Sequence, residues 1–143
     1  MPVPDPVPGL VLHYAYLWHD EYQQGMQEGV KDRPCVIVSA VNREDGGTGV
    51  TVVPVTHTFP WTSGITVEIP LATKRRLGLD SDRSWVVVTE VNRFSWPGPD
   101  LRQVPGRGTG IYHYGMVPPV LFSQIKNGIL VSARGQRLRT TLR

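Results

Sequence analysis

The chain has 143 residues, enough for one domain with its own hydrophobic core. A single cysteine excludes an internal disulfide and a zinc site built from cysteines. The 15 glycines and 13 prolines favour a β-rich domain with many turns, and the net charge of +3 makes polyanions plausible partners. That charge does not distinguish RNA from DNA or from an acidic protein.

The amino-terminal residues 1–8 carry a proline at every second position. Such a segment prefers an extended path, so we interpret it as an arm that can lie over a neighbour. It lacks the basic start and apolar stretch of a signal peptide. Because no apolar run approaches the ~20 residues of a membrane span, we expect a cytoplasmic protein that makes no contact with membranes.

Short apolar runs separated by turn residues then predict a series of strands. We expect strands at residues 9–18, 35–41, 50–55, 65–69 and 85–91. Residues 19–31 are polar and form a loop of about a dozen residues, long enough to be suspected of function. Pro54 interrupts the run 50–55, which indicates an edge strand or a bulge there because proline cannot donate to a sheet.

The remaining segments predict one closing helix. Apolar residues recur at helical spacing over residues 117–133, while residues 71–79 suit a single helical turn. Residues 134–143 contain four arginines and no acid, which predicts a solvated basic tail or, alternatively, a tail that binds nucleic acid or an acidic partner. We therefore expect a mainly β protein whose strands roll into a small barrel over residues 9–133, closed by a carboxy-terminal helix.

Two short motifs stand at the ends of predicted strands. Arg33-Pro34 opens the strand 35–41, and Pro54-Val55-Thr56 closes the strand 50–55. Val67-Glu68-Ile69 follows, and then a late strand carries Glu90 and Arg93. In this order and spacing, the chain from about residue 31 to residue 93 resembles the MazF/PemK family of toxins from type II toxin–antitoxin systems.

The resemblance implies an SH3-like barrel of the CcdB/PemK type and a homodimer. It implies an endoribonuclease that needs no metal or other cofactor and cuts single-stranded RNA, leaving a 2′,3′-cyclic phosphate and a 5′-hydroxyl. The implied partners are messenger RNA and a cognate antitoxin protein, with DNA bound only indirectly through the antitoxin. We expect the carboxy-terminal segment of that antitoxin to cover the groove that holds the catalytic residues.

Carried over by position, Arg33 takes the place of the catalytic arginine of the family and Thr56 that of its active-site threonine. Glu90 matches the acidic position on the late strand, and Arg93 matches the arginine three residues on; we expect both to bind RNA. The chemistry of arginine suits this role for Arg33, because two guanidinium N–H groups can donate to two phosphate oxygens. The family pattern is not complete, since some relatives carry a second arginine where this chain has Val88.

The general base is not fixed by the resemblance. His57 follows Thr56 directly, so the two side chains point to opposite faces unless Pro54 breaks the strand. His19 is the better catalytic candidate because its loop can fold across Arg33. We assign His57 to RNA binding, together with Trp96, an aromatic residue in a proline-rich loop that could stack on a base.

A second interpretation stays open on the same fold. The Val88 departure is compatible with a module that binds without cutting. It would either poison gyrase as CcdB toxins do, or bind RNA and leave it intact. The decisive expectation is spatial: Arg33 and Thr56 must meet on one concave surface.

Overall fold

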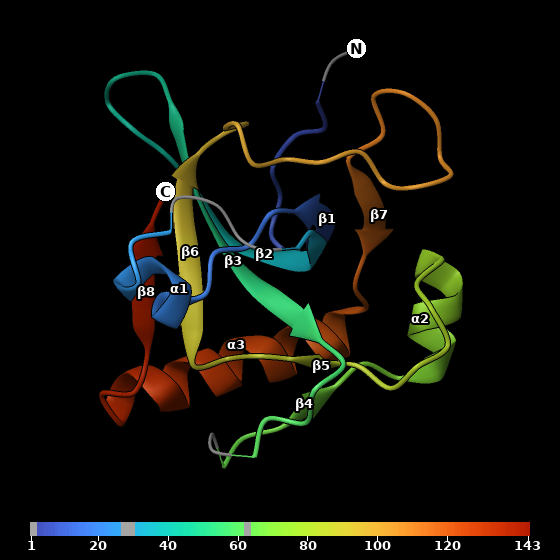
Figure 1. Ribbon diagram of the computed structural model, residues 1–143, viewed down its shortest axis with the longest axis vertical. Helices are drawn as coiled ribbons and strands as arrows, with labels where there is room; N and C mark the ends of the chain where they lie inside the picture. Colours follow the sequence, from blue (N-terminus) through green and yellow to red (C-terminus); the bar gives the residue numbers. More distant parts are fainter. Residues whose placement is uncertain (1–2, 27–30, 62–63) are drawn as a thin grey trace.

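The computed structural model describes residues 3–26, 31–61 and 64–143, and in these residues a curled sheet dominates (Figure 1). Three helices accompany the sheet: α1 (His19–Gln23), α2 (Leu71–Leu77) and α3 (Pro119–Arg134). The eight strands are β1 (Leu10–Tyr14), β2 (Arg33–Asn42), β3 (Thr48–Thr56), β4 (Val67–Glu68), β5 (Trp85–Val86), β6 (Glu90–Ser95), β7 (His113–Met116) and β8 (Arg139–Leu142). The prediction of a mainly β protein is confirmed, and the sheet curls into a half-barrel.

The sheet is built around the long hairpin of β2 and β3. Its order is β4-β5-β3-β2-β1-β7, and β6 leaves this path by pairing with both β3 and β8. All pairs are antiparallel except β6 with β8. Because β2 lies between β1 and β3, the residue that opens β2 is flanked by one strand on each side.

Pro54 lies where β3 exchanges one partner for another. Residues 49–52 of β3 pair with β6, whereas Val55 and Thr56 pair with β5. On its other side Pro54 faces Cys35 of β2, so it lies inside the sheet. Its carbonyl accepts the N–H of Val87. Proline lacks an N–H, but at this position the N–H would point to the side on which the partner of β3 changes from β6 to β5. The prediction of an edge strand or bulge at Pro54 is therefore wrong, and β3 continues through it.

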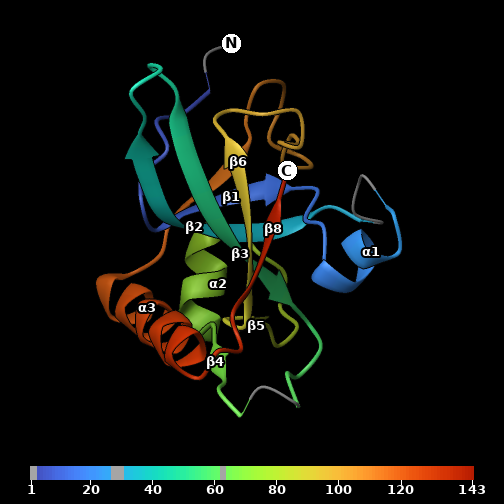
Figure 2. The ribbon, with the colours of Figure 1, turned by 90° about the vertical axis from the view of Figure 1, so that its left-hand side faces the viewer.

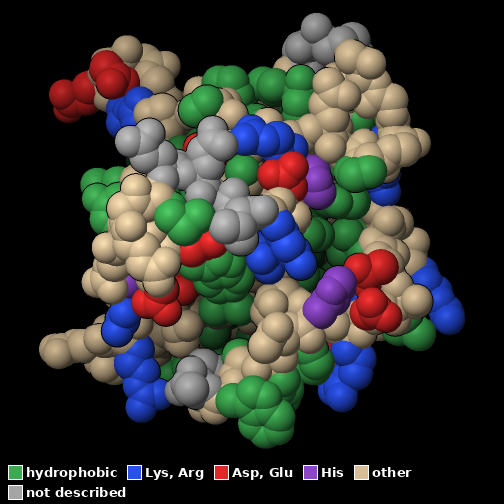
Figure 3. Space-filling model, in the orientation of Figure 1, with side chains coloured by type: hydrophobic (Ala, Val, Ile, Leu, Met, Phe, Trp, Pro, Cys, Tyr) green, Lys and Arg blue, Asp and Glu red, His purple; other side chains and the backbone are tan. Residues whose placement is uncertain are grey.

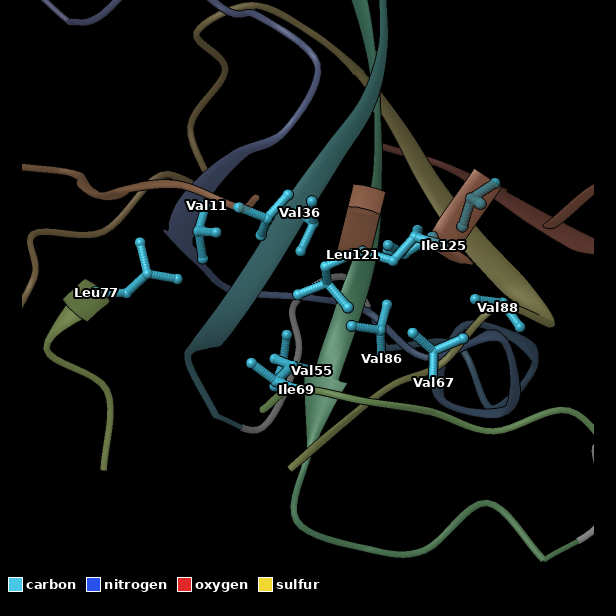
Figure 4. Close-up of a cluster of buried hydrophobic side chains, with 13 residues drawn as sticks. Val11, Val36, Val55, Val67, Ile69, Leu77, Val86, Val88, Leu121 and Ile125 are labelled. Carbon is cyan, nitrogen blue, oxygen red and sulfur yellow. The ribbon is translucent and has the colours of Figure 1, made fainter. Parts of the chain in front are cut away.

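Two apolar clusters cover the two faces of the sheet. The larger lies between the sheet and α3, which contributes Leu121 and Ile125 (Figure 4). Gly128 of α3 fits against Val88, since a Cβ at that position would lie 2.8 Å from the valine side chain. The second cluster includes Tyr16 and Cys35, both fully buried. Figure 2 shows α2 and α3 on one side of the sheet and α1 at the other.

The last strand corrects the prediction of a solvated basic tail. Residues 139–142 form β8, which pairs in parallel with β6 and places Glu90 opposite Arg139 (Figure 2). Arg143 is 5% exposed and forms an ion pair of 2.9 Å with Asp100, which is 8% exposed. The arginines of this segment predicted a solvated tail, but the side chain of Arg143 is buried.

Several further boundaries differ from the predicted ones; for example, the predicted strand 9–18 is β1, which ends at Tyr14. The predicted loop 19–31 begins with α1, and its residues 27–30 lie outside the described residues. The predicted strand 85–91 divides into β5 and the start of β6. Residues 71–77 form a helix, α2, that ends at Gly78 with φ 75°. No helix in the described ranges combines the length and apolar character needed to cross a membrane.

Candidate functional site

A groove of about 530 Å³ opens where β2 begins and β3 ends. We call it the Arg33 groove. Strands β1, β2, β3 and β7, the segment after α2, and the loop before β7 supply its walls. Its charged, histidine and hydroxyl-bearing lining residues are His13, Lys31, Asp32, Arg33, Thr56, His57, Thr58, Lys74, Asp80, Ser84, Arg107 and Tyr114. Histidine, basic and acidic side chains gather together on the face shown in Figure 3.

Arg33 is held at the rim of this groove by contacts on two sides. One terminal nitrogen, Nη1, donates to the carbonyl of Val55 at 3.3 Å. The guanidinium carbon lies 4.9 Å from the centre of the Trp18 ring. The Nε atom is buried and has no hydrogen-bond partner among the described residues. The guanidinium is thus fixed in place while part of its donor capacity is unused.

Thr56 and His57 both line the groove. Thr56 is the last residue of β3, and its hydroxyl accepts the backbone N–H of Thr58 at 3.1 Å. His57 follows the end of the strand, so strand alternation no longer sends it to the opposite face. The sequence-based expectation that these neighbours could share a surface only if Pro54 broke the strand is wrong, because the strand simply ends between them.

His57 belongs to a polar chain that reaches into the protein. Its Nε2 atom lies 2.8 Å from Oδ2 of Asp80, and Oδ1 of Asp80 accepts from Lys74 Nζ at 2.6 Å. Lys74 is 2% exposed and also donates to the carbonyl of Asp82 and to the hydroxyl of Ser84. The Lys74 hydrogen bond and the His57 charge lower the pKa of Asp80 against the opposing effect of burial. Asp80 is therefore a fixed carboxylate.

His13 approaches the groove from the other side. It lies on β1 opposite Pro34, and its Nδ1 atom is 2.9 Å from the hydroxyl of Tyr114. Burial lowers the pKa of His13, with Arg102 acting in the same direction and Asp32 opposing it. Burial also raises the pKa of Tyr114, although nearby Arg107 opposes this. At neutral pH these shifts favour an uncharged pair of side chains.

His19 and Glu90 lie away from the groove. The backbone N–H of His19 and the hydroxyl of Tyr16 both donate to Glu90 Oε1 at 3.0 Å. The Nδ1 atom of His19 is buried and has no hydrogen-bond partner in the described part of the chain. Burial raises the pKa of Glu90 in spite of these hydrogen bonds. The structure thus places Glu90 as an anchor that joins the start of α1 to β6.

Arg93 and Trp96 also lie elsewhere. Arg93 lines a second groove of about 490 Å³, which we call the Arg93 groove, on one face of β2, β3, β6 and β8. Its other lining residues are Ser39, Val41, Arg43, Gly49, Val50, Thr51, Phe94, Ser95, Leu142 and Arg143. Trp96 is half-buried and packs against the second apolar cluster, its ring centre 6.2 Å from that of Phe94. Of the predicted site residues, the structure therefore brings together Arg33, Thr56 and His57.

A metal ion has one geometrically possible position among the described residues. Ligand atoms of His57, Asp80 and Asp82 lie within 4.8 Å of one another. All three residues are exposed, and the Asp80 carboxylate already contacts Lys74 and His57. The polar chain is complete as a hydrogen-bonded unit, so we assign no metal to it.

Sequence reasoning missed His13, Lys74, Asp80 and Tyr114. A signal existed for His13, since it is a polar residue inside an otherwise apolar strand. Comparison of the sequence with protein-family models found no match, and comparison with curated proteins found none either.

Proposed function

We propose that this chain is the toxin of a type II toxin–antitoxin system, an endoribonuclease that cleaves single-stranded RNA. The observation that carries the proposal is that Arg33 and Thr56, which are 23 positions apart in the sequence, line one groove. The curled β sheet with its carboxy-terminal α3 is compatible with an SH3-like barrel of the CcdB/PemK type. The resemblance of the sequence motifs to the MazF/PemK family supplies the reaction.

Arg33 is the group that we expect to bind the scissile phosphate. Its Val55 contact and its stacking on Trp18 fix the guanidinium without using all its donors. A preorganised donor aimed at developing charge contributes about 10²–10³-fold to a reaction rate. As negative charge accumulates on the phosphorane oxygens, these donors bind the transition state more tightly than the ground state.

The proposed reaction uses the RNA as its own nucleophile. The 2′-oxygen attacks the adjacent phosphorus, the bond to the 5′-oxygen breaks, and a 2′,3′-cyclic phosphate and a 5′-hydroxyl result. Thr56 supplies a hydroxyl that can donate to a phosphate oxygen while it accepts from the Thr58 N–H. The proposed reaction needs no cofactor.

The partners follow from the same proposal. We expect cleavage of messenger RNA in the cytoplasm, a homodimer, and neutralisation by an antitoxin whose carboxy-terminal segment fills the Arg33 groove. DNA would be bound through the antitoxin only. Neutralisation that survives deletion of that antitoxin segment would contradict the proposed contact, and a monomer by light scattering at micromolar concentration would contradict the dimer.

The test is cleavage of long single-stranded RNA by purified protein in the presence of EDTA. We expect the wild type to cut and to leave cyclic phosphate ends, and Arg33→Ala to lose at least about 10²-fold in rate. Induced expression should arrest growth for the wild type and not for the variant. Intact RNA with the wild-type protein, together with normal growth, would refute the proposal.

A non-cleaving module is the second candidate, and one observation favours it. Glu90 and Val88, the late-strand positions at which relatives carry acidic and basic residues, do not line the Arg33 groove, and Val88 is buried in the core. Such a module would bind RNA and leave it intact, or would bind gyrase. Recovery of gyrase in a pull-down with undamaged RNA in the same sample would favour this candidate.

A further inference from the structure

We propose that His13 and His57 are the acid–base pair of the Arg33 groove, with His13 as general base and His57 as general acid. This assignment rests on the proposed RNA-cleaving function and goes beyond it, because the resemblance names neither histidine. It also adds a positioning role for Asp80. Three observations support it: the strand order, the contact of His13 with Tyr114, and the contact of His57 with Asp80.

The strand order places the two histidines on opposite sides of Arg33. Arg33 opens β2, the strand that lies between β1 and β3. His13 comes from β1, and His57 follows the end of β3. All three line the same groove. Displacement at phosphorus is in line, so a base and an acid must approach the phosphate from opposite sides, as this arrangement allows.

His13 has the surroundings of a base. If Nδ1–H donates to the Tyr114 hydroxyl, 2.9 Å away, the lone pair of Nε2 is left to accept the proton of the 2′-hydroxyl. The tyrosine in turn is held by Arg107, whose guanidinium carbon lies 5.2 Å from the ring centre. The charged groups that act on His13 are Asp32 and Arg102, which form an ion pair of 3.7 Å with each other. Burial favours the uncharged imidazole that a base requires.

His57 has the surroundings of an acid. Its Nε2–H donates to the fixed carboxylate of Asp80 at 2.8 Å, so the proton on Nδ1 is the one available for transfer. Lys74 holds the other oxygen of the same carboxylate at 2.6 Å, and Asp82 lies beside the pair. The remaining charges of the groove, on Lys31, Asp32, Arg33 and Arg107, also face this space. Asp80 is a positioning residue, since it acts on the phosphate through His57.

The proton balance of the step is complete. The bond between the 2′-oxygen and phosphorus forms as the proton of the 2′-hydroxyl moves to His13 Nε2. The bond between phosphorus and the 5′-oxygen breaks as the 5′-oxygen receives the proton from His57 Nδ1. Proton exchange with water returns both side chains to their starting states, so no co-reactant is consumed.

A modified substrate separates the two roles. The cleavage position is first mapped with the wild type, and an oligonucleotide spanning it is made with sulfur in place of the bridging 5′-oxygen. A thiolate leaves without being protonated, so it needs a base but no acid. We expect His57→Ala to lose about 10²–10⁴-fold on the ordinary oligonucleotide and to come within about threefold of wild type on the sulfur-bridged one. We expect His13→Ala to lose a similar factor on both.

Asp80→Asn tests the positioning role through the same pair of substrates. We expect the variant to lose rate on the ordinary oligonucleotide and to come within about threefold of wild type on the sulfur-bridged one, because only a departing oxygen needs the proton that Asp80 positions through His57. His113→Gln is the control, since His113 lies on β7 and does not line the groove. RNA binding and thermal unfolding of each variant show whether it is folded.

The outcomes distinguish a failure of the proposed function from a failure of the acid–base assignment. If the wild type does not cut RNA, both the proposed function and the acid–base assignment fall. If the wild type cuts but both histidine variants retain its rate, or if the sulfur-bridged substrate fails to restore His57→Ala in a folded protein, only the assignment falls. Equal losses on the two substrates in Asp80→Asn, or no loss on either, would overturn the positioning role.

Discussion

The two grooves of this protein are nearly equal in volume and different in chemistry. The Arg33 groove measures about 530 Å³ and the Arg93 groove about 490 Å³, and they lie at opposite ends of the β2–β3 hairpin. Both are lined by arginines. The Arg33 groove also contains two histidines, each in contact with a polar side chain, whereas no histidine, aspartate or glutamate lines the Arg93 groove among the described residues.

Volume and positive charge therefore do not distinguish the proposed catalytic groove from the other one. Both grooves could attract a polyanion. Within the residues that the structure describes, only the Arg33 groove places imidazole side chains, which can accept or donate a proton, beside a fixed cation. The predictions below therefore pair a substitution in one groove with a matched substitution in the other.

The largest expected effect concerns the buried cation beside each groove. Arg143 and Asp100 are both nearly fully buried, so Arg143→Met leaves a carboxylate without its partner and should lower the free energy of unfolding by about 3–5 kcal/mol. Lys74→Met should cost less, about 2 kcal/mol, because its partner Asp80 is 52% exposed and can be solvated. Urea denaturation followed by fluorescence measures both. A larger loss for Lys74→Met than for Arg143→Met would show that burial of the partner carboxylate does not set the size of the loss.

The next effect tests the two arginines for which the grooves are named. Arg33→Lys keeps the charge but loses the planar set of donors, and we expect a loss of about 10²-fold in RNA cleavage. Arg93→Lys on the exposed face of β6 should stay within about twofold. Equal losses in the two variants would mean that the Arg93 groove takes part in catalysis.

A smaller effect is expected from the threonines of β3. Thr56 ends the strand in the Arg33 groove, while Thr51 lies on the same strand in the Arg93 groove. Thr56→Val removes a hydroxyl that we expect to donate to a phosphate oxygen, and the rate should fall by about tenfold. Thr51→Val should leave the rate unchanged. Steady-state cleavage of the mapped oligonucleotide measures both, and a retained rate in Thr56→Val would remove this residue from the site.

The smallest effect concerns Glu90, which lies outside both grooves. Its pKa is raised in the folded protein, so its contribution to stability is full below the pKa of an unfolded glutamic acid and is lost as the pH rises through the folded value. Glu90→Gln cannot ionise and keeps an oxygen for Tyr16 and His19. We expect the stability of the variant relative to the wild type to increase as the pH rises above the ordinary pKa of glutamic acid. A stability difference that does not change with pH would contradict this.

The sequence was sufficient to predict that Arg33 and Thr56 lie close together, but not which side chains surround them. Apolar runs predicted β2 and β3 closely, because both strands are buried and rich in β-branched residues. Since these strands pair in antiparallel register, the residue that opens β2 necessarily meets the residue that closes β3. The position of Arg33 and Thr56 in one groove therefore followed from two short motifs.

The features that the sequence did not predict depend on contacts between segments that are distant along the chain. The segment that forms β8 has no apolar alternation, and only its pairing with β6 makes it a strand. Lys74 stands in a basic run between leucines, and only the fold shows that α2 turns it toward Asp80 and Ser84. His13 was passed over because its partner, Tyr114, lies 101 residues away. Such pairs leave no local pattern in a sequence.

The buried thiol of Cys35 provides a built-in probe for the opening of β2. It is the single cysteine of the chain, fully buried two residues after Arg33, and burial raises its pKa far above the ordinary value. An alkylating reagent can reach this thiol only when β2 separates from its neighbours. The labelling rate therefore reports how often the strand that carries the proposed phosphate-binding arginine opens. A ligand seated in the Arg33 groove should slow that rate without any probe being added to the protein.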